Sequence, residues 1–345
     1  MSCDSDDSND DNIEPAPTPN PPTEGEAFFV TKAYDPIGLN PSLAWSTDLE
    51  EWTIWHNGFS FNSVDNDGDE LIYSKINDIE YNIYISDDGG RTESVFSPPS
   101  GLTFYSSAVH REGTLILEYS NTIYTTTDNG LNWQNTSLVE NFTGNIFYLN
   151  DEFVFFVSSG NIYTSQDGSS WNVSNIGFTF DQVLNYDGGY YLGSINSNSL
   201  YKTAQDYETI LDTILVERID TTQDNTLSQA RFLLNGNNLE AFGTFYDDDI
   251  QMEVPYKCTS LDDGQTWTFE RTNTPVSRSS GSSINWPYDS DWSFTYQNGF
   301  YYANFYSDLI ARTVPHYSTD GIDWQRVNDP VLKFEYEGFY FVSPN

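Results

Sequence analysis

The side chains best suited to binding chemistry in this sequence are arginines and aromatic rings gathered in its last third. The chain is very acidic, with 52 acidic residues against 13 basic ones and a formal net charge of −39. Guanidinium groups can hold a carboxylate through paired hydrogen bonds, and aromatic faces can stack on a sugar ring. The candidate residues are Arg231, Arg278, Trp286, Tyr288, Trp292, Tyr306, Arg312 and His316. They predict a site for an anionic glycan or another acidic ligand. The alternative is that the arginines neutralise neighbours such as Asp289 and Asp291.

Other residue patterns indicate chemistry less strongly. The segment from Asp65 to Glu70 is similar to a calcium loop, but no Glu follows at the required distance, so we expect a hairpin turn. His56, His110 and His316 have no partner at ligand spacing, so we expect neither a metal nor a cofactor. No G-x-S-x-G nucleophile elbow occurs. Among 52 acidic residues some pair will always lie at glycosidase distance, so pairing alone does not indicate catalysis.

A repeated phrase organises the elements that must position these side chains: a Ser or Thr, an Asp two residues later, then Gly and Trp. The clearest copy runs from Ser260 through Asp262 and Gly264 to Trp267. Asp accepts hydrogen bonds from turn N–H groups, Gly supplies a positive φ, and Trp plugs the start of the next strand. The anchor positions are Asp48, Asp88, Asp128, Asp167, Gln205, Asp262 and Asp320. Their regular spacing predicts an array of one supersecondary unit, with degraded copies at Ser86 and Thr203.

This S-x-D-x-G-x-T-W phrase resembles the Asp-box (BNR) repeat of β-propellers, a family that includes sialidases, sortilin-type receptor ectodomains and photosystem assembly factors. The resemblance covers about residues 27 to 345. It implies an all-β, seven-bladed β-propeller with Asp-box turns. Alternating aromatic and β-branched residues, without a long amphipathic helix, independently favour an all-β chain.

The resemblance leaves three functions open. Sialidases of the family use three Arg on the substrate carboxylate, a Tyr nucleophile with a Glu partner, and an Asp acid. Their N-terminal Arg lies in an F/Y-R-I-P segment before the first repeat, whereas Phe28 to Lys32 contain no Arg. We therefore favour a non-catalytic propeller that binds a glycan or a protein. The alternatives are an exo-acting, sialidase-like glycoside hydrolase with Arg231, Arg278 and Arg312 as its triad, and an assembly or scaffold factor for a membrane complex.

The fourth unit serves as the template for a blade. Its strands are expected at Asn145–Leu149, Phe153–Ser158, Asn161–Ser165 and Trp171–Ser174. We expect the C-terminus to close the ring. Val331–Tyr336 should supply the first strand of the blade that contains Asp48, while Phe339–Val342 and Phe28–Lys32 compete for its second strand.

Blades six and seven are longer than the others. Their extra residues are expected in loops between the second and third strands, at about 246–255 and 306–315, and in the connection at about 272–291. These loops should emerge opposite the Asp-box turns. Together with a loop at 34–40 in blade one, they define the sector where we expect the ligand to bind.

Residues 1–26 are predicted to be a disordered tether before a propeller at 27–345. The acidic run from Asp4 to Asn12 and the Pro-rich segment after it cannot bury a core. Cys3 at its head resembles the lipid-modified first residue of a mature bacterial lipoprotein; the alternative is a chance Cys in a tail. No apolar signal segment precedes Cys3, so we expect a trimmed chain that restarts at Met1.

Charge and cysteine usage limit the partners. A net charge of −39 repels nucleic acid and anionic membranes, so we expect membrane contact only through a lipid anchor at Cys3. The expected location is the bacterial cell envelope, at the outer membrane or cell surface, and the expected state is a monomer. With Cys258 as the second Cys, expected to be a buried free thiol, no disulfide framework is possible.

Overall fold

A computed structural model of the chain describes residues 26–34, 41–55, 60–66, 70–76, 81–88, 92–102, 105–137, 146–157, 159–178, 180, 182–186, 188–193, 199–217, 227–247, 252–274, 277–278, 284–285, 295–307, 312–327 and 339–343. The predicted tether, including Cys3, lies outside these ranges. Within them, no helix has the length and apolar character needed to cross a membrane.

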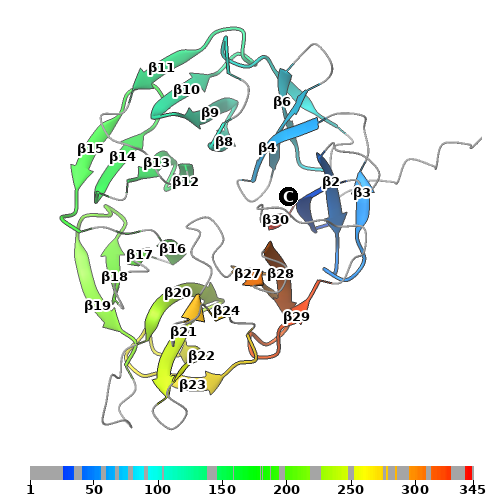
Figure 1. Ribbon diagram of the computed structural model, residues 1–345. Coiled ribbons are helices and arrows are strands. Elements are labelled where there is room, and N and C mark those ends of the chain that lie inside the picture. The colour runs from blue at the N-terminus through cyan, green and yellow to red at the C-terminus, as the bar shows by residue number, and fades with distance from the viewer. Residues whose placement is uncertain are drawn as a thin grey trace, which may run out of the picture.

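Seven four-stranded antiparallel sheets stand side by side in a ring, as Figure 1 shows. In six of the sheets the four strands follow one another along the chain. The first strand of each lies nearest the centre of the ring and the fourth forms the rim, for example β12 and β15 in blade four. The prediction of an all-β, seven-bladed β-propeller is confirmed.

The strands are divided among the blades as follows. Blade one contains β1 (Phe28–Tyr34), β2 (Pro41–Ser46), β3 (Thr53–Trp55) and β30 (Phe339–Val342); blade two contains β4 (Ser60–Asn66), β5 (Leu71–Ile76), β6 (Tyr81–Ser86) and β7 (Ser94–Phe96). Blade three contains β8 (Ser107–Arg111), β9 (Thr114–Tyr119), β10 (Thr122–Thr126) and β11 (Gln134–Ser137); blade four contains β12 (Ile146–Leu149), β13 (Glu152–Phe156), β14 (Asn161–Ser165) and β15 (Asn172–Asn175). Blade five contains β16 (Gln182–Tyr186), β17 (Gly189–Gly193), β18 (Ser199–Ala204) and β19 (Ile210–Leu215); blade six contains β20 (Ser228–Asn235), β21 (Asn238–Asp247), β22 (Met252–Ser260) and β23 (Thr268–Arg271). Blade seven contains β26 (Thr295–Gln297), β27 (Phe300–Ser307), β28 (Arg312–Ser318) and β29 (Gln325–Arg326), and a small hairpin of β24 (Ser277–Arg278) and β25 (Ile284–Asn285) precedes it.

The C-terminal strand closes the ring by completing blade one. β30 pairs antiparallel with β1, from Phe28 opposite Val342 to Thr31 opposite Phe339. The expectation that these two segments compete for one place is wrong, because they lie next to each other in the same sheet. β30 takes the first-strand position that we had expected for Val331–Tyr336, a segment outside the described residues.

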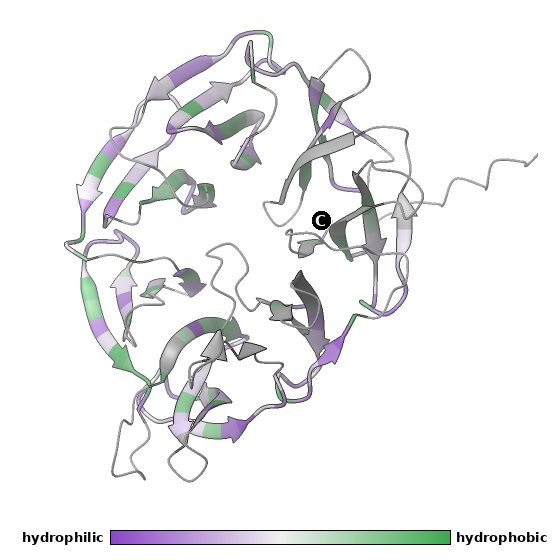
Figure 2. Cartoon of the chain, viewed as in Figure 1, coloured by the Kyte–Doolittle hydropathy of each residue, from purple (hydrophilic) through white to green (hydrophobic). Residues whose placement is uncertain are grey.

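Apolar side chains between neighbouring blades form the core. Between blades three and four, Val109 and Ile116 pack with Phe153 and Phe155, and all four are at most 2% exposed. Cys258 forms no disulfide with a described residue and is fully buried in the layer between blades five and six. Hydropathy also differs between the inner and outer strands: Figure 2 shows hydrophobic colour on inner strands and more polar colour on several outer ones. Because each layer needs two blades, no blade can bury its own core alone.

The turns between third and fourth strands share a hydrogen-bond pattern. In blade four, Ser165 Oγ donates to Asp167 Oδ1 (3.1 Å), and the N–H groups of Ser169 and Ser170 donate to the same oxygen (2.8 and 2.9 Å). Trp171 Nε1 then donates to the Gly168 carbonyl (3.1 Å). The turns at Asp48 and Asp320 repeat this arrangement, and those at Asp88, Asp128 and Asp262 use a version one residue longer.

In blade five the anchoring carboxylate is Asp206, not the neighbouring Gln205 that we had expected. Asp206 Oδ1 accepts from the N–H groups of Glu208 (3.1 Å) and Thr209 (2.9 Å), the same offsets that Asp167 uses. Ala204 therefore stands where other turns have Ser or Thr, and the missing hydroxyl is why the sequence pattern was misaligned by one residue.

Each of these turns whose contacts are described packs on the blade before it. A Cβ at Gly168 would lie 2.6 Å from Ile116 Cδ1 of blade three, and Thr125 Oγ1 donates to the Gly168 carbonyl (2.6 Å). Blades one and five carry Leu49 (φ 63°) and Tyr207 (φ 62°) at the position of this glycine. Both side chains are buried against the preceding blade. The repeated turn is therefore a clamp between blades.

Candidate functional site

The predicted site residues differ in how much of each the structure describes. Arg231 and His316 are described with their side chains, whereas Arg278, Tyr306 and Arg312 are placed by their backbone alone. The three remaining candidates, Trp286, Tyr288 and Trp292, lie outside the described residues. The composition of the predicted site therefore stays a prediction.

Arg231 and His316 both lie in the layer between blades six and seven. Arg231, on β20, is 3% exposed and shares a strand face with Leu233, which packs on blade seven. His316, on β28, is 9% exposed and meets the Phe305 ring edge to face, with centroids 5.2 Å apart. Side chains as buried as these can support a ligand site only from beneath its surface.

The extra residues of blades six and seven lengthen strands instead of forming the loops that we had expected. β21 and β22 pair as far as Asp247 opposite Met252, so 246–247 and 252–255 belong to strands. β27 and β28 pair as far as Ser307 opposite Arg312. The reason is that alternating residues such as those of Arg312–Ser318 continue the ladder once a neighbouring strand is available. Tyr306 and Arg312 thus lie near the end of a long hairpin.

The connection into blade seven also contains structure. β24 and β25 pair through Ser277 with Asn285 and Arg278 with Ile284, and β24 contacts β27. The strand of Arg278 therefore lies against the strand of Tyr306. Because β22 and β28 run from their hairpins to the Asp262 and Asp320 turns, the hairpins and the turns are at opposite ends of the blades.

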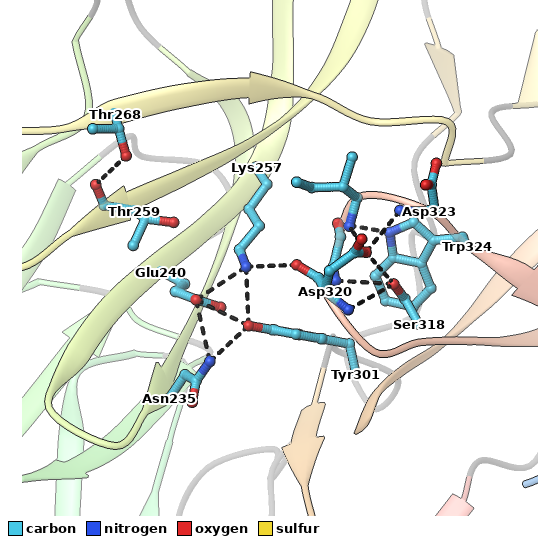
Figure 3. Close-up of polar contacts among 12 residues, drawn as sticks. Asn235, Glu240, Lys257, Thr259, Thr268, Tyr301, Ser318, Asp320, Asp323 and Trp324 are labelled. Atoms are coloured by element: carbon cyan, nitrogen blue, oxygen red, sulfur yellow. Dashed lines mark hydrogen bonds and ion pairs between the residues drawn. The ribbon is translucent and has the colours of Figure 1, made fainter. Parts of the chain in front are cut away.

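A buried polar network links blades six and seven near the turn end, as Figure 3 shows. Lys257 Nζ lies 3.1 Å from Glu240 Oε1 and donates to the Tyr301 hydroxyl (2.9 Å) and to the Asp320 carbonyl (2.7 Å). The Tyr301 hydroxyl donates in turn to Glu240 Oε1 (2.9 Å), and Asn235 Nδ2 donates to that hydroxyl (2.7 Å). Tyr301 belongs to blade seven, so the network fixes this blade against blade six.

The Tyr301–Glu240 pair has the residue types of a tyrosine nucleophile and its carboxylate partner, but it is closed to solvent. Both side chains are 2% exposed. Burial, together with the charge of Glu240, raises the pKa of the Tyr301 hydroxyl. A phenol that holds its proton and cannot meet a substrate does not act as a nucleophile, so the arrangement is structural.

Two other lysines make similar clusters with tyrosines and a carboxylate. Lys202 and Tyr191 of blade five both hydrogen-bond the carboxylate of Asp263 in the turn of blade six. In blade two, Lys75 and Tyr73 share Glu93, and Lys75 Nζ lies 4.1 Å from the centre of the Tyr84 ring. Sequence reasoning missed these clusters because their members come from different strands and turns, with each carboxylate 18 to 72 residues from its partners. The combination of few lysines with many tyrosines and many carboxylates is the feature of the sequence that could have indicated such clusters.

The structure also locates the segment similar to a calcium loop and one of the histidines. β4 and β5 pair as a hairpin, with Asn66 opposite Leu71, as expected for the segment similar to a calcium loop. His110 Nδ1 lies 2.7 Å from Glu70 Oε2, which joins blade three to blade two. Among the described residues, no group of three or more His, Cys, Asp or Glu side chains could hold a metal ion.

No protein-family model matches the chain, and no curated protein matches it. A functionally unknown protein from Desulfotomaculum acetoxidans DSM 771 is similar in structure, with a TM-score of 0.56, 10% identity, and coverage of 93% of this chain and 100% of that one. BamB from Moraxella catarrhalis (TM-score 0.41, 14% identity) covers 79% of this chain and 87% of its own. The WD40 β-propeller domain of Doa1 (TM-score 0.41, 13% identity) covers 75% and 85%. Similarity at these identities shows nothing beyond the fold, and the seven four-stranded sheets make the chain a seven-bladed β-propeller.

Proposed function

We propose that this protein is a non-catalytic propeller that binds a glycan or protein ligand over blades six, seven and one. The two long hairpins are the observation that carries the proposal. β22 has nine residues and β14 has five, so at roughly 3.3 Å per residue the longer strand spans about 30 Å against about 17 Å. Residues added on one side of a rigid ring are typical of a binding surface.

The residues on these hairpins suit an acidic ligand. Arg278, Tyr306 and Arg312 lie on the strands that converge there, and Trp286, Tyr288 and Trp292 follow β25 in the chain. In a chain of net charge −39, guanidinium groups supply the local positive charge that a carboxylate needs. Aromatic faces beside them would select a sugar ring.

The burial of the Tyr301–Glu240 pair favours binding over turnover. An exo-acting glycosidase needs its nucleophile and acid exposed to the substrate. The Tyr301–Glu240 pair is buried. The ammonium group of Lys257 already contacts the Glu240 carboxylate and the Asp320 carbonyl. The sialidase-like alternative would have to draw its residues from elsewhere.

We further infer that the chain is an Asp-box propeller held at the bacterial cell envelope by a lipid on Cys3. The turns repeat one geometry, in which a carboxylate oxygen accepts hydrogen bonds from two backbone N–H groups. This repetition supports the assignment as an Asp-box propeller. Expression of the full chain behind a lipoprotein signal, with Cys3→Ser as the control, tests the lipid anchor. Loss of membrane association in Cys3→Ser is expected, whereas unchanged association would contradict the anchor.

The first experiment is a glycan array probed with residues 25–345, run beside a fluorogenic exo-glycosidase panel. We expect capture without turnover, lost in Arg312→Ala and weakened in Trp286→Ala and Trp292→Ala. Arg326→Ala is the matched control, because this exposed arginine lies on the same blade at the turn end. Turnover lost in Arg312→Ala would instead support the enzyme. No capture and no turnover, with a co-purifying membrane complex, would support a scaffold.

A further inference from the structure

The rim of blade five differs from the other rims. β19 is the outer strand of this blade, and no described strand pairs with its free edge. It has six residues, whereas the other outer strands have two to four. Folded proteins usually keep such edges short and charged, because unpaired N–H and C=O groups recruit strands from other chains.

β19 is also apolar where it meets water. Ile210, Leu211 and Leu215 are 44%, 56% and 44% exposed, and Figure 2 shows hydrophobic colour along this rim. Ile210 stands four residues after Asp206, the position at which Trp171 plugs the corresponding turn of blade four. The register shifts between Lys202 and Thr203, so Leu211 is the extra residue of a bulge. Ile210 therefore takes the plug position of the turn, whereas the exposed side chains of Leu211 and Leu215 lie beyond that position.

The same strand is bordered by negative charge. Glu208, Asp212 and Glu217 are exposed along it. Lys202 is paired with Asp212 in the ladder, but its ammonium group hydrogen-bonds Asp263 of the neighbouring turn instead. Among the described residues, the donors to Asp212 are neutral groups, the Gln265 amide (3.3 Å) and the Thr213 N–H (2.8 Å). Within the described residues, the edge thus combines aliphatic side chains with a carboxylate, Asp212, whose ladder neighbour Lys202 is bound elsewhere.

We propose that the free edge of β19 is a docking site for an extended, cationic segment of a partner protein, which adds to blade five as a fifth strand. Backbone pairing would supply affinity, and alternating aliphatic and basic side chains would meet Leu211, Leu215 and the acidic residues. A second copy of this chain suits the edge badly, because pairing two copies would oppose acidic edges of molecules with −39 each. The proposal is independent of the ligand site over blades six, seven and one.

The test uses residues 25–345 and a fluorescein-labelled peptide of nine residues in which Val alternates with Lys and Thr. Fluorescence anisotropy at low salt should show saturable binding that weakens as salt is raised. A peptide with Glu in place of Lys should not bind. A third peptide, N-methylated along one edge, should bind at least about tenfold more weakly, because it cannot complete the strand ladder.

Variants of the edge separate docking from general attraction to an acidic protein. Leu211→Ser/Leu215→Ser should weaken binding of the Lys peptide by about tenfold or more. Val173→Ser on the rim of blade four and Leu131→Ser in the turn of blade three are the controls, since these side chains are 56% and 80% exposed. All four positions are exposed, so thermal midpoints should stay close to that of the parent chain.

Three outcomes would overturn the proposal. The Lys peptide could fail to bind, the N-methylated peptide could bind equally well, or the control variants could lose as much affinity as the edge variant. A dimer in sedimentation that dissociates in Leu211→Ser/Leu215→Ser would replace the cationic partner by a second copy.

Discussion

Asp167 illustrates how one carboxylate organises a turn. Hydrogen bonds from the N–H groups of Ser170 and Ser169 lower its pKa to about 2, against an ordinary value of 3.8. Ser169 and Ser165 add side-chain hydrogen bonds in the same direction. The pKa values of Asp48, Asp128, Asp206, Asp262 and Asp320 are lowered too. The ionised form is thus the one that the folded ring prefers at six turns.

Removing this carboxylate should make the chain less stable only where the carboxylate is ionised. Because the folded pKa is the lower one, the stabilisation is complete above about pH 4 and is lost as the pH falls towards 2. Asp167→Ala should cost about 1 kcal/mol at neutral pH, with Asp167→Asn costing less because an acceptor oxygen remains. Urea midpoints at about pH 7 and pH 2.5 check this. A difference from the parent chain that is the same at both pH values would contradict the role of the charge.

A glycine of the same turn offers a second prediction. Gly168→Ala would place a Cβ 2.6 Å from Ile116 Cδ1 at a φ of 70°, whereas Gly177→Ala has a similar φ of 80° and meets nothing within 4 Å. Gly177→Ala should cost about 1 kcal/mol for backbone strain, and Gly168→Ala about 1 to 3 kcal/mol more for the clash. Equal urea midpoints for the two variants would show that the turn does not press on blade three.

At the scale of elements, the polar networks hold neighbouring blades together with unequal strength. Lys257 and Glu240 are nearly closed to solvent, whereas Asp263, the partner of Lys202, has a side chain that is 46% exposed. Glu240 Oε2 is buried and has no hydrogen-bond partner in the part of the chain that the structure describes, so the carboxylate depends there on the contacts of its other oxygen. An exposed ion pair costs little to break, but a buried carboxylate left without its cation costs much.

Lys257→Met should therefore destabilise the chain by about 3 to 5 kcal/mol, and Lys202→Met by about 1 kcal/mol or less. Adding Glu240→Leu to Lys257→Met should recover part of the loss, because no buried charge remains. Urea denaturation of the single and double variants forms the required cycle. Comparable losses for the two lysines would show that burial does not set the contribution of these clusters.

The sequence predicts elements better than it predicts their contacts. The strands of blade four fall within two residues of their expected bounds, because apolar alternation and turn residues are local signals. Asp206 was missed because Ala204 interrupts the repeated phrase. The hairpins of blades six and seven were mistaken for loops because their extra residues exceed the usual strand length, although the alternation continues through them. The burial of Arg231 and His316 depends on a neighbouring blade, which no local pattern contains.

At the scale of the whole molecule, one strand decides whether the ring is closed. Phe341 packs on Phe29 with ring centroids 4.9 Å apart, and Val342 is fully buried in the layer between blades one and two. Truncation after Gly338 removes β30 and uncovers both β1 and this layer. We expect a fall of at least about 10 °C in thermal midpoint, because the buried Val342 and the half-buried Phe341 are lost and the buried Phe28 and Phe29 are uncovered.

Truncation after Ser343 is the matched control, since it shortens the chain but keeps β30. Its thermal midpoint should match that of the full chain. If both truncations left the midpoint unchanged, the antiparallel pairing of β30 with β1 would not be what closes the propeller.

The pairing of β30 with β1 also sets an order of events during synthesis. β1 emerges from the ribosome first of the two, and its partner β30 emerges some 300 residues later. At translation rates of about 5 to 20 residues per second, that interval is roughly 15 to 60 s. During this time the apolar strand of Phe28 and Phe29 has one edge unsatisfied, however well the later blades have assembled. A nascent chain of this protein should therefore need a chaperone on β1 until β30 has been made.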